Sequence, residues 1–201
     1  MIKAVFFDFD GVLTLESSGS YTVAKFLEAK IGIDHDKIKN TLIRRHREIL
    51  TGALDYEQEL DTINHELGST ITRDLLLQAM VALTPNKAML NVAKSLREKG
   101  VFIGIITDQS AVRIKMIRQK FILDEKFNRI IASGDVGHTK KDIEIFQLAV
   151  DGLEVASDEI LFIENTESNL EIPKLLGWQT YFHDDAKNDM NRLRDFLKSH
   201  G

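Results

Sequence analysis

Short apolar runs alternate with helical patterns over much of the chain. Five runs have the length and the apolar content of strands: residues 2–8, 101–107, 129–133, 159–163 and 178–182. Most are continuous rather than alternating in polarity, which is typical of a parallel sheet covered on both faces. Between them, apolar residues recur at helical spacing. These stripes are Met89, Val92, Ala93 and Leu96; Ile114, Ile117 and Phe121; Ile143, Phe146 and Val150; Leu170, Leu175 and Leu176; and Met190, Leu193 and Leu197.

The alternation of strand and helix from residue 87 onward predicts an α/β fold, a Rossmann-like three-layer core with a parallel sheet and right-handed crossovers. Residues 15–84 differ, because they contain helical stripes and no strand pattern. Within them, the segment RDLLLQAMVAL is apolar nearly all round and predicts a buried helix. We therefore expect an inserted all-helical cap over 15–84 and a core domain formed by 1–14 and 85–201.

Composition adds mainly exclusions. The chain has 201 residues, no cysteine and a net charge of −5, so we expect no disulfide, no thiolate metal site and no nucleic-acid partner. No apolar run approaches the roughly 20 residues of a membrane span, and residues 1–14 do not resemble a secretory signal. These features predict a cytoplasmic protein, either a monomer or a homodimer. The basic run at 44–48 is typical of a solvated helix face, although recognition of an anionic substrate stays open for it.

Polar residues gather where the predicted strands end. Asp8, Asp10 and Gly11 follow the first strand, and TDQS (107–110), GHTKKD (137–142) and ENTESN (164–169) follow the next three. Ligands of open parallel sheets bind outside the carboxyl ends of the strands. We therefore expect the acids, hydroxyl groups and lysines of these segments to line one site. Asp108 and Ser110 are also expected to cap the helix that follows them, and the HDD segment at 183–185 is expected to face solvent.

The pair Asp8 and Asp10 is the strongest chemical signal. The two side chains are one residue apart and project to the same side of an extended chain. Two carboxylates there can bind a hard cation such as Mg²⁺, one can attack as a nucleophile, and the other can move protons. Gly11 would allow the backbone to approach a phosphate. Phosphoryl transfer needs mainly positioning and neutralisation of charge, which a metal, a lysine and a hydroxyl can supply.

The segment DFDGVLT resembles the first motif of the haloacid dehalogenase-like hydrolase superfamily, and the later motifs follow in that family's order over essentially the whole chain. The resemblance implies that Asp8 is the nucleophile forming an aspartyl-phosphate and that Asp10 is the general acid/base. It places Thr107 and Lys140, with Asp108 beside them, on the phosphoryl group. It assigns Mg²⁺ to Asp8, to the backbone carbonyl of Asp10, and to Glu164 and Asn165. The family's small helical cap is inserted where this chain has residues 15–84.

Three positions depart from the family pattern: Asp108 stands where asparagine is usual, Lys141 where proline is common, and Asn165 where a second aspartate is usual. Asn165 offers an oxygen but no charge, so the affinity for Mg²⁺ should fall unless Glu164 compensates. The expected function is a Mg²⁺-dependent phosphatase acting on a small phosphorylated metabolite. A sugar phosphomutase stays open, as does a catalytically weakened protein that binds a ligand. Because dehalogenases of the family lack the second aspartate, Asp10 argues against dehalogenation.

Overall fold

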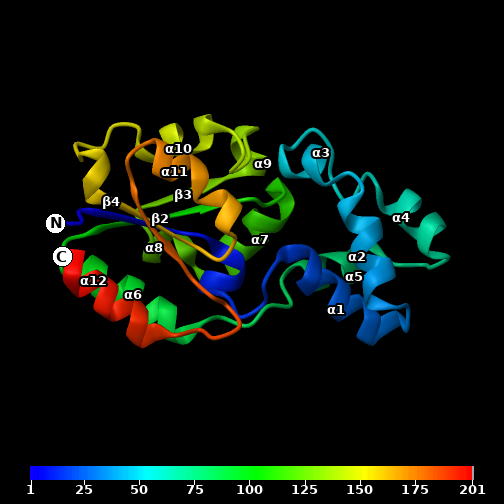
Figure 1. Cartoon of the computed structure of the whole chain (residues 1–201). Coiled ribbons are helices and arrows are strands. Elements are labelled where there is room, and N and C mark those ends of the chain that lie inside the picture. Colours follow the sequence, from blue (N-terminus) through cyan, green and yellow to red (C-terminus); the bar gives the residue numbers. More distant parts are fainter. Residues whose placement is uncertain (201) are drawn as a thin grey trace.

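A five-stranded parallel sheet with helices around it forms one part of the molecule, and the helices of residues 15–84 lie to one side of that part (Figure 1). The strand order is β3-β2-β1-β4-β5. The computed structural model describes residues 1–200. The strands are β1 (Ala4–Phe7), β2 (Phe102–Thr107), β3 (Arg129–Ala132), β4 (Ile160–Glu164) and β5 (Gln179–Phe182). All five predicted strands are therefore confirmed, and the α/β fold class with them.

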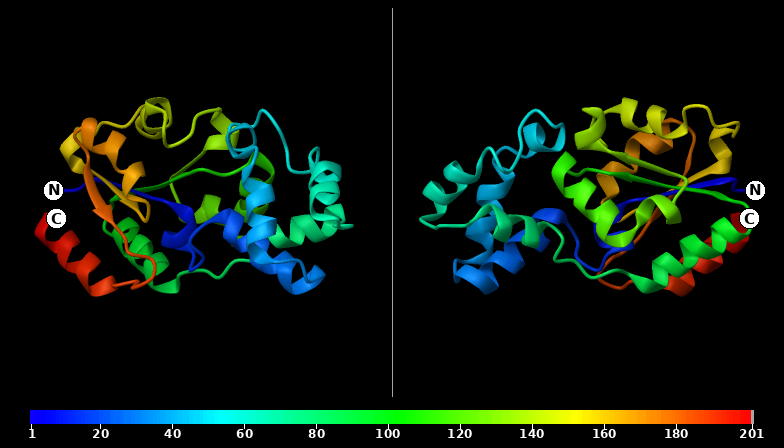
Figure 2. Two further views of the ribbon diagram at one scale, coloured as in Figure 1. Left: turned by 45° about the vertical axis from the view of Figure 1, so that its right-hand side comes forward. Right: turned by 180° about the vertical axis from the view of Figure 1, so that it is seen from behind.

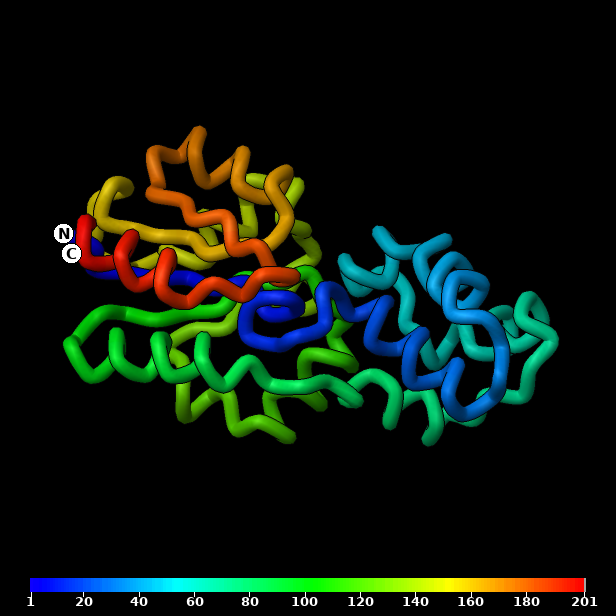
Figure 3. Tube along the Cα trace, turned by 60° about the horizontal axis from the view of Figure 1, so that its bottom comes forward, coloured from blue at the N-terminus to red at the C-terminus, as the bar shows by residue number. Residues whose placement is uncertain are grey.

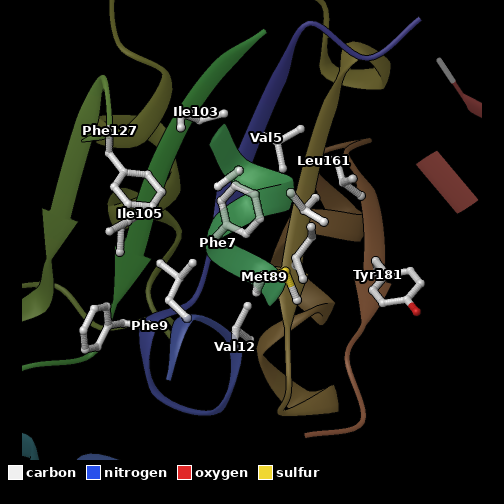
Figure 4. Packing of buried hydrophobic residues seen from close by; sticks show 14 of the residues in the cluster. Val5, Phe7, Phe9, Val12, Met89, Ile103, Ile105, Phe127, Leu161 and Tyr181 are labelled. Atoms are coloured by element: carbon white, nitrogen blue, oxygen red, sulfur yellow. The ribbon is translucent and has the colours of Figure 1, made fainter. Parts of the chain in front are cut away.

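Side chains of the sheet alternate between two apolar layers, as the period of two along a strand requires. On β1, Val5 and Phe7 join one core cluster, while Ala4 and Phe6 join the other. The first cluster includes residues of the helices α6 (Lys87–Glu98), α7 (Ala111–Phe121) and α12 (Met190–His200), and Figure 4 shows Met89 of α6 near Phe7. The second includes residues of α10 (Ile143–Val150) and Ile172 of α11 (Glu171–Leu175). Helices therefore cover both faces of the sheet.

Two of the expected apolar positions on the covering helices lie outside the core. Ile143 is 40% exposed and Leu175 is 85% exposed. The buried face of α10 is instead formed by Ile145, Phe146 and Ala149. Apolar spacing locates a helix well, but its rotation is decided by which side chains reach the sheet.

Residues 15–84 contain helices and no strand, as expected. They form α1 (Gly19–Ile31), α2 (His35–Ile43), α3 (His46–Leu50), α4 (Leu60–Leu67) and α5 (Arg73–Met80). These helices lie together beside the sheet (Figures 1 and 2) and share a separate apolar cluster that includes Leu27, Ile38 and Leu76. The buried residues Ile38 and Leu42 belong to α2, whereas Ile49 belongs to α3. The division of the chain at residues 15 and 84 stays a prediction.

The chain enters and leaves this helical segment along two neighbouring stretches. Leu15 donates its amide to the carbonyl of Thr84 at 2.9 Å, and Asn86 donates its amide to the carbonyl of Leu13 at 2.8 Å. The termini of the chain also meet, since the amide of Ile2 donates to the carbonyl of His200 (Figure 3).

Short elements complete the chain: a single turn at Phe9–Leu13, α8 (Leu123–Lys126), α9 (Ser133–Val136), and 3-10 turns at Ser157–Glu159 and Glu167–Asn169. Among residues 1–200, no helix is long and apolar enough to cross a membrane.

Candidate active site

A cavity of about 460 Å³ opens between the strand ends and the helical segment. From the strand ends it is lined by Asp8, Asp10, Thr107, Asp108, Lys140 and Asn165. From the helical segment it is lined by Ser17, Ser18, Gly19, Ser20, Val23, His46, Arg47, Leu50 and Tyr56. Most of the predicted site residues therefore meet in one place. Gly11 and Glu164 are buried and contact lining residues, Gly11 contacting Asn165 and Glu164 contacting Lys140.

One ammonium group joins two carboxylates at the floor of the cavity. Lys140 Nζ lies 2.8 Å from Asp8 Oδ1 and 2.6 Å from Glu164 Oε2. Glu164 is fully buried and also accepts hydrogen bonds from the Thr166 amide at 2.9 Å and from Asn169 Nδ2 at 3.2 Å. The carboxylate of Glu164 is thus held rigidly, and it fixes Lys140 against Asp8.

More than one carboxylate surrounds the single positive charge of Lys140. Burial raises the pKa of Asp8 to about 8, with a further contribution from the charge of Glu164, against the opposing effect of Lys140. Burial alone would lower the pKa of Lys140, but the charges of Asp8, Glu164 and Asp108 outweigh it and raise that pKa. Burial also raises the pKa of Asp108. The site therefore holds an excess of negative charge that a bound cation would relieve.

Asp10 is engaged by two residues that the sequence analysis did not single out. Arg113 of α7 donates two hydrogen bonds to its carboxylate, at 2.6 and 2.9 Å, and Gln109 Nε2 donates a third at 2.5 Å. Arg113 lies four residues before Ile117, on the apolar face of its helix. The sequence could have marked Arg113, because a charged residue on the buried face of a helix needs a partner of opposite charge.

Thr107 and its neighbours take different roles. Thr107 is buried, and its hydroxyl accepts a hydrogen bond from Gln109 Nε2 at 3.3 Å. Ser110 caps α7, because its hydroxyl accepts a hydrogen bond from the amide of Arg113, as serine commonly does at the start of a helix. Asp108 was expected to act as a helix cap, which is wrong: its carboxylate accepts from the backbone amide of Lys140 at 2.9 Å. Asp108 thus fixes the loop that carries Lys140.

Gly11 has a positive φ of 80°, and a Cβ at this residue would lie 2.1 Å from Asn165 Nδ2. The Asn165 side chain packs directly on the glycine and donates to Ser17 O at 3.3 Å and Asp185 Oδ2 at 3.4 Å. The expectation that residues 183–185 face solvent is wrong for His183, which is buried, and Asp185 reaches Asn165. The position of the Asn165 carboxamide is therefore fixed by contacts with three segments of the chain, at Gly11, Ser17 and Asp185.

Gly11→Ala should displace the Asn165 side chain and destabilise the protein. Forcing an alanine into this backbone region costs about 1–2 kcal/mol, and the clash with Asn165 adds to that cost. Gly32→Ala is the matched control, because Gly32 has φ 69° and nothing within 4 Å of its Cβ position. Urea unfolding of both variants should show the larger loss at Gly11. Equal losses would show that the contact with Asn165 has no energetic weight.

The donors at this site fit a hard cation in their chemistry, because they are oxygens and carry excess negative charge. Those available are the Asp8 carboxylate, the Asp10 carbonyl and the Asn165 carboxamide oxygen. Glu164 is already used by Lys140, Thr166 and Asn169. Among residues 1–200, no three His, Asp or Glu side chains are grouped to hold a metal. The set is consistent with a weakly held Mg²⁺ that relies on backbone and amide oxygens.

The basic run at 44–48 divides between two environments. Arg44 and Arg45 are exposed and pair with Glu66 at 2.9 Å and Glu59 at 3.4 Å, as a solvated helix face predicts. His46 and Arg47 line the cavity, where Arg47 is exposed and lies 3.4 Å from Asp142 Oδ1, and burial lowers the pKa of His46. Part of this run therefore lies where it could contact an anionic substrate in the cavity.

Comparison with known proteins identifies related hydrolases. The chain is 24% identical to the bifunctional epoxide hydrolase 2 of Rattus norvegicus over 213 residues, which cover 96% of this chain but 38% of that protein. It is 26% identical to the glyceraldehyde 3-phosphate phosphatase of Methanopyrus kandleri, over 81% of this chain and 75% of the relative. The chain therefore spans well under half of the epoxide hydrolase and most of the archaeal phosphatase.

Solved structures share the whole fold. An enzyme of the HAD family from Bacteroides thetaiotaomicron, solved as a magnesium complex, superposes with a TM-score of 0.77 over 96% of this chain and 98% of that one, at 20% identity. The profile of the haloacid dehalogenase-like hydrolase family matches residues 2–177. The order of the strands, the placement of the four polar segments and this match agree, and the chain belongs to the haloacid dehalogenase-like hydrolase family.

Proposed function

We propose that this protein is a Mg²⁺-dependent phosphatase that hydrolyses a small phosphomonoester through an aspartyl-phosphate on Asp8. The observation that carries the proposal is the carboxylate of Asp8, which lines the cavity and is held 2.8 Å from the ammonium of Lys140. A carboxylate fixed beside a cation at the floor of a pocket is suited to attack a phosphoryl group. Two relatives support this choice, because one is named as a phosphatase and a structural neighbour was solved with magnesium.

The reaction has two steps. An oxygen of Asp8 attacks phosphorus, the bond from phosphorus to the leaving oxygen breaks, and that oxygen takes a proton from Asp10. A water then attacks the same phosphorus, gives its proton to Asp10, and releases inorganic phosphate and free Asp8. In the free protein Asp10 is the ionised partner of Arg113, so the proton that it gives to the leaving oxygen comes from the bound phosphomonoester monoanion. The proton that it takes from water passes to the released phosphate, so protons balance.

Other residues bind and neutralise. Lys140 and the hydroxyl of Thr107 would contact the equatorial phosphoryl oxygens, with Gly11 allowing close approach of the backbone. Asp8, the carbonyl of Asp10 and Asn165 would hold Mg²⁺, with Glu164 positioning Lys140. The bound ion would supply charge neutralisation for the phosphoryl group. The helical segment would act as a cap that excludes bulk water, with the leaving group held near His46 and Arg47.

Removal of the metal tests the proposal. Phosphate release from p-nitrophenyl phosphate and from a panel of sugar, polyol and triose phosphates should require Mg²⁺. Chelation with EDTA should lower turnover about 10²-fold or more, because a metal supplies several kcal/mol of stabilisation to the transition state. Excess Mg²⁺ should restore it. If EDTA leaves turnover unchanged, the proposed requirement for Mg²⁺ is wrong. If no phosphate in the panel is hydrolysed, the alternative of a protein that binds a ligand without hydrolysing it is favoured.

The same assay separates a phosphatase from a phosphomutase. A phosphatase transfers the phosphoryl group to water, so inorganic phosphate accumulates in proportion to the substrate consumed. A mutase returns it to a sugar hydroxyl, so an isomeric phosphate accumulates instead. A relative named as a phosphatase favours the first outcome, and we expect it.

A further inference from the structure

Arg113 is buried more deeply than its charge would allow without a strong partner. It is 3% exposed, and its guanidinium binds both oxygens of Asp10, Nη1 to Oδ2 at 2.6 Å and Nη2 to Oδ1 at 2.9 Å. The two residues are 103 positions apart in the sequence. A bidentate arginine–carboxylate pair of this kind fixes the plane and the position of the carboxyl group.

Gln109 closes the arrangement into a ring. Its Nε2 donates to Asp10 Oδ2 at 2.5 Å, and its Oε1 accepts a hydrogen bond from Arg113 Nη1. Both oxygens of Asp10 are therefore engaged by side chains from the loop after β2 and from the first turn of α7. The carboxyl group cannot turn without breaking several of these bonds.

Arg113 also contacts both ends of the helical segment. Its Nε donates to the carbonyl of Met80, the last residue of α5, at 3.0 Å. On the other side lies Gly19, the first residue of α1, where a Cβ would be 2.6 Å from Arg113 Nη1. The guanidinium of Arg113 therefore contacts Asp10 and also lies beside Met80 and Gly19, near the two points where the cap joins the core.

Stability does not explain this placement. Replacing a buried ion pair by apolar residues is often neutral or favourable to stability. Arg113 nevertheless lies on an otherwise apolar face of α7, beside Ile114 and Ile117, where a leucine would pack. Its contacts instead go to the residue that the proposed reaction uses for proton transfer.

We propose that Arg113 is a positioning residue for Asp10, and that it ties the position of the Asp10 carboxyl group to the location of the cap. The part that concerns Asp10 rests on the proposed function. The tie between Arg113 and the cap rests on the contacts with Met80 and Gly19 alone.

The kinetic test is a double-mutant cycle with p-nitrophenyl phosphate and Mg²⁺. Arg113→Lys and Arg113→Met are made in the wild type and in Asp10→Asn. Arg118→Lys is the matched control, because Arg118 lies on the same helix and also binds a carboxylate, Asp124, with two nitrogens, but at the surface. The pair Asp10→Asn with Arg113→Met removes both charges together, so that no unpaired charge is left buried.

We expect kcat to fall about tenfold in Arg113→Lys and about 10²-fold in Arg113→Met, within the range that general acid/base catalysis contributes. KM should stay within about twofold, and Arg118→Lys should match the wild type. In Asp10→Asn the same Arg113 substitutions should change kcat by less than about twofold, since the residue through which they act is gone. Equal losses in both backgrounds, or a change in KM alone, would overturn the proposal.

Hydrogen exchange supplies a readout that needs no turnover. Amides of residues 14–19 and 80–86 should exchange faster in Arg113→Lys than in the wild type or in Arg118→Lys, because the bond to Met80 is weakened. Unchanged exchange would overturn the tie to the cap. If the wild type releases no phosphate from any substrate, the proposed function fails, while the exchange rates still decide whether Arg113 holds the cap connections.

Discussion

Asp8→Asn should abolish phosphate release and, in the absence of metal, make the protein more stable. Removal of a nucleophile that forms a covalent intermediate costs about 10⁴-fold or more in kcat. The gain in stability follows from the charges at the cavity floor, where Asp8 and Glu164 face the single ammonium of Lys140. An asparagine at residue 8 leaves one carboxylate against one ammonium and removes the excess negative charge.

This gain in stability should depend on pH. The pKa of Asp8 is raised from 3.8 to about 8, first by burial and then by the charge of Glu164. The folded protein therefore binds more protons than the unfolded chain between about pH 4 and pH 8. The contribution of this carboxyl group is fully present below pH 4 and is lost as the pH rises toward 8. The Asn variant lacks this slope, so its advantage should be larger at pH 8 than at pH 5.

Thermal unfolding in EDTA at pH 5 and pH 8 measures both effects. Asp195→Asn is the control, because Asp195 is a surface carboxylate of α12 whose side chain is 75% exposed. It should leave turnover and the midpoint of unfolding unchanged at both pH values. Mg²⁺ should narrow the difference between wild type and Asp8→Asn, since the ion stabilises only the protein that binds it. If the Asp8→Asn protein is less stable than the wild type at pH 8, the cavity floor does not hold the excess of negative charge described above.

The layers of the fold could be read from the sequence because they depend on patterns within single segments. Continuous apolar runs such as 159–163 are found in strands that are covered on both faces, and the polar segments after them meet because parallel strands end at one edge. This convergence also brings Asp8, Thr107 and Lys140 to one cavity. The rotation of α10 was not predictable, because Ile143 and Ile145 are equally apolar and only packing on the sheet decides between them.

The contacts of Asp10 could not be predicted from such local patterns. Nothing local links Asp10 to Arg113, since their partnership depends on how the loop after β1 meets the start of α7. The role of Asp108 was misread for a similar reason: its spacing before α7 fits a helix cap, but its carboxylate reaches the amide of Lys140 across the site. Polar residues with two possible partners are assigned by tertiary structure, and active sites collect such residues.

Lys140→Met should destabilise the metal-free protein severely. It removes the one ammonium between Asp8 and Glu164, so that the buried carboxylate of Glu164, and that of Asp8 where it is ionised, lose their counter-charge. Breaking a buried ion pair by removing one partner costs about 3–5 kcal/mol. The metal-free protein should lose that amount in the free energy of unfolding, and phosphate release should fall with it, because the phosphoryl oxygens lose their positive contact.

Lys141→Met is the matched control, because Lys141 is the next residue, is exposed, and its ammonium donates to the backbone oxygen and hydroxyl of Ser168 rather than to a carboxylate. It should change the free energy of unfolding by no more than about 0.5 kcal/mol. Combining Lys140→Met with Asp8→Asn should recover part of the loss, since one of the two unpaired carboxylates is then neutral. The two substitutions are in contact and should not be additive. If Lys140→Met costs no more than Lys141→Met in urea unfolding, the ammonium does not hold the two carboxylates together, and the charge arrangement on which Asp8 depends is wrong.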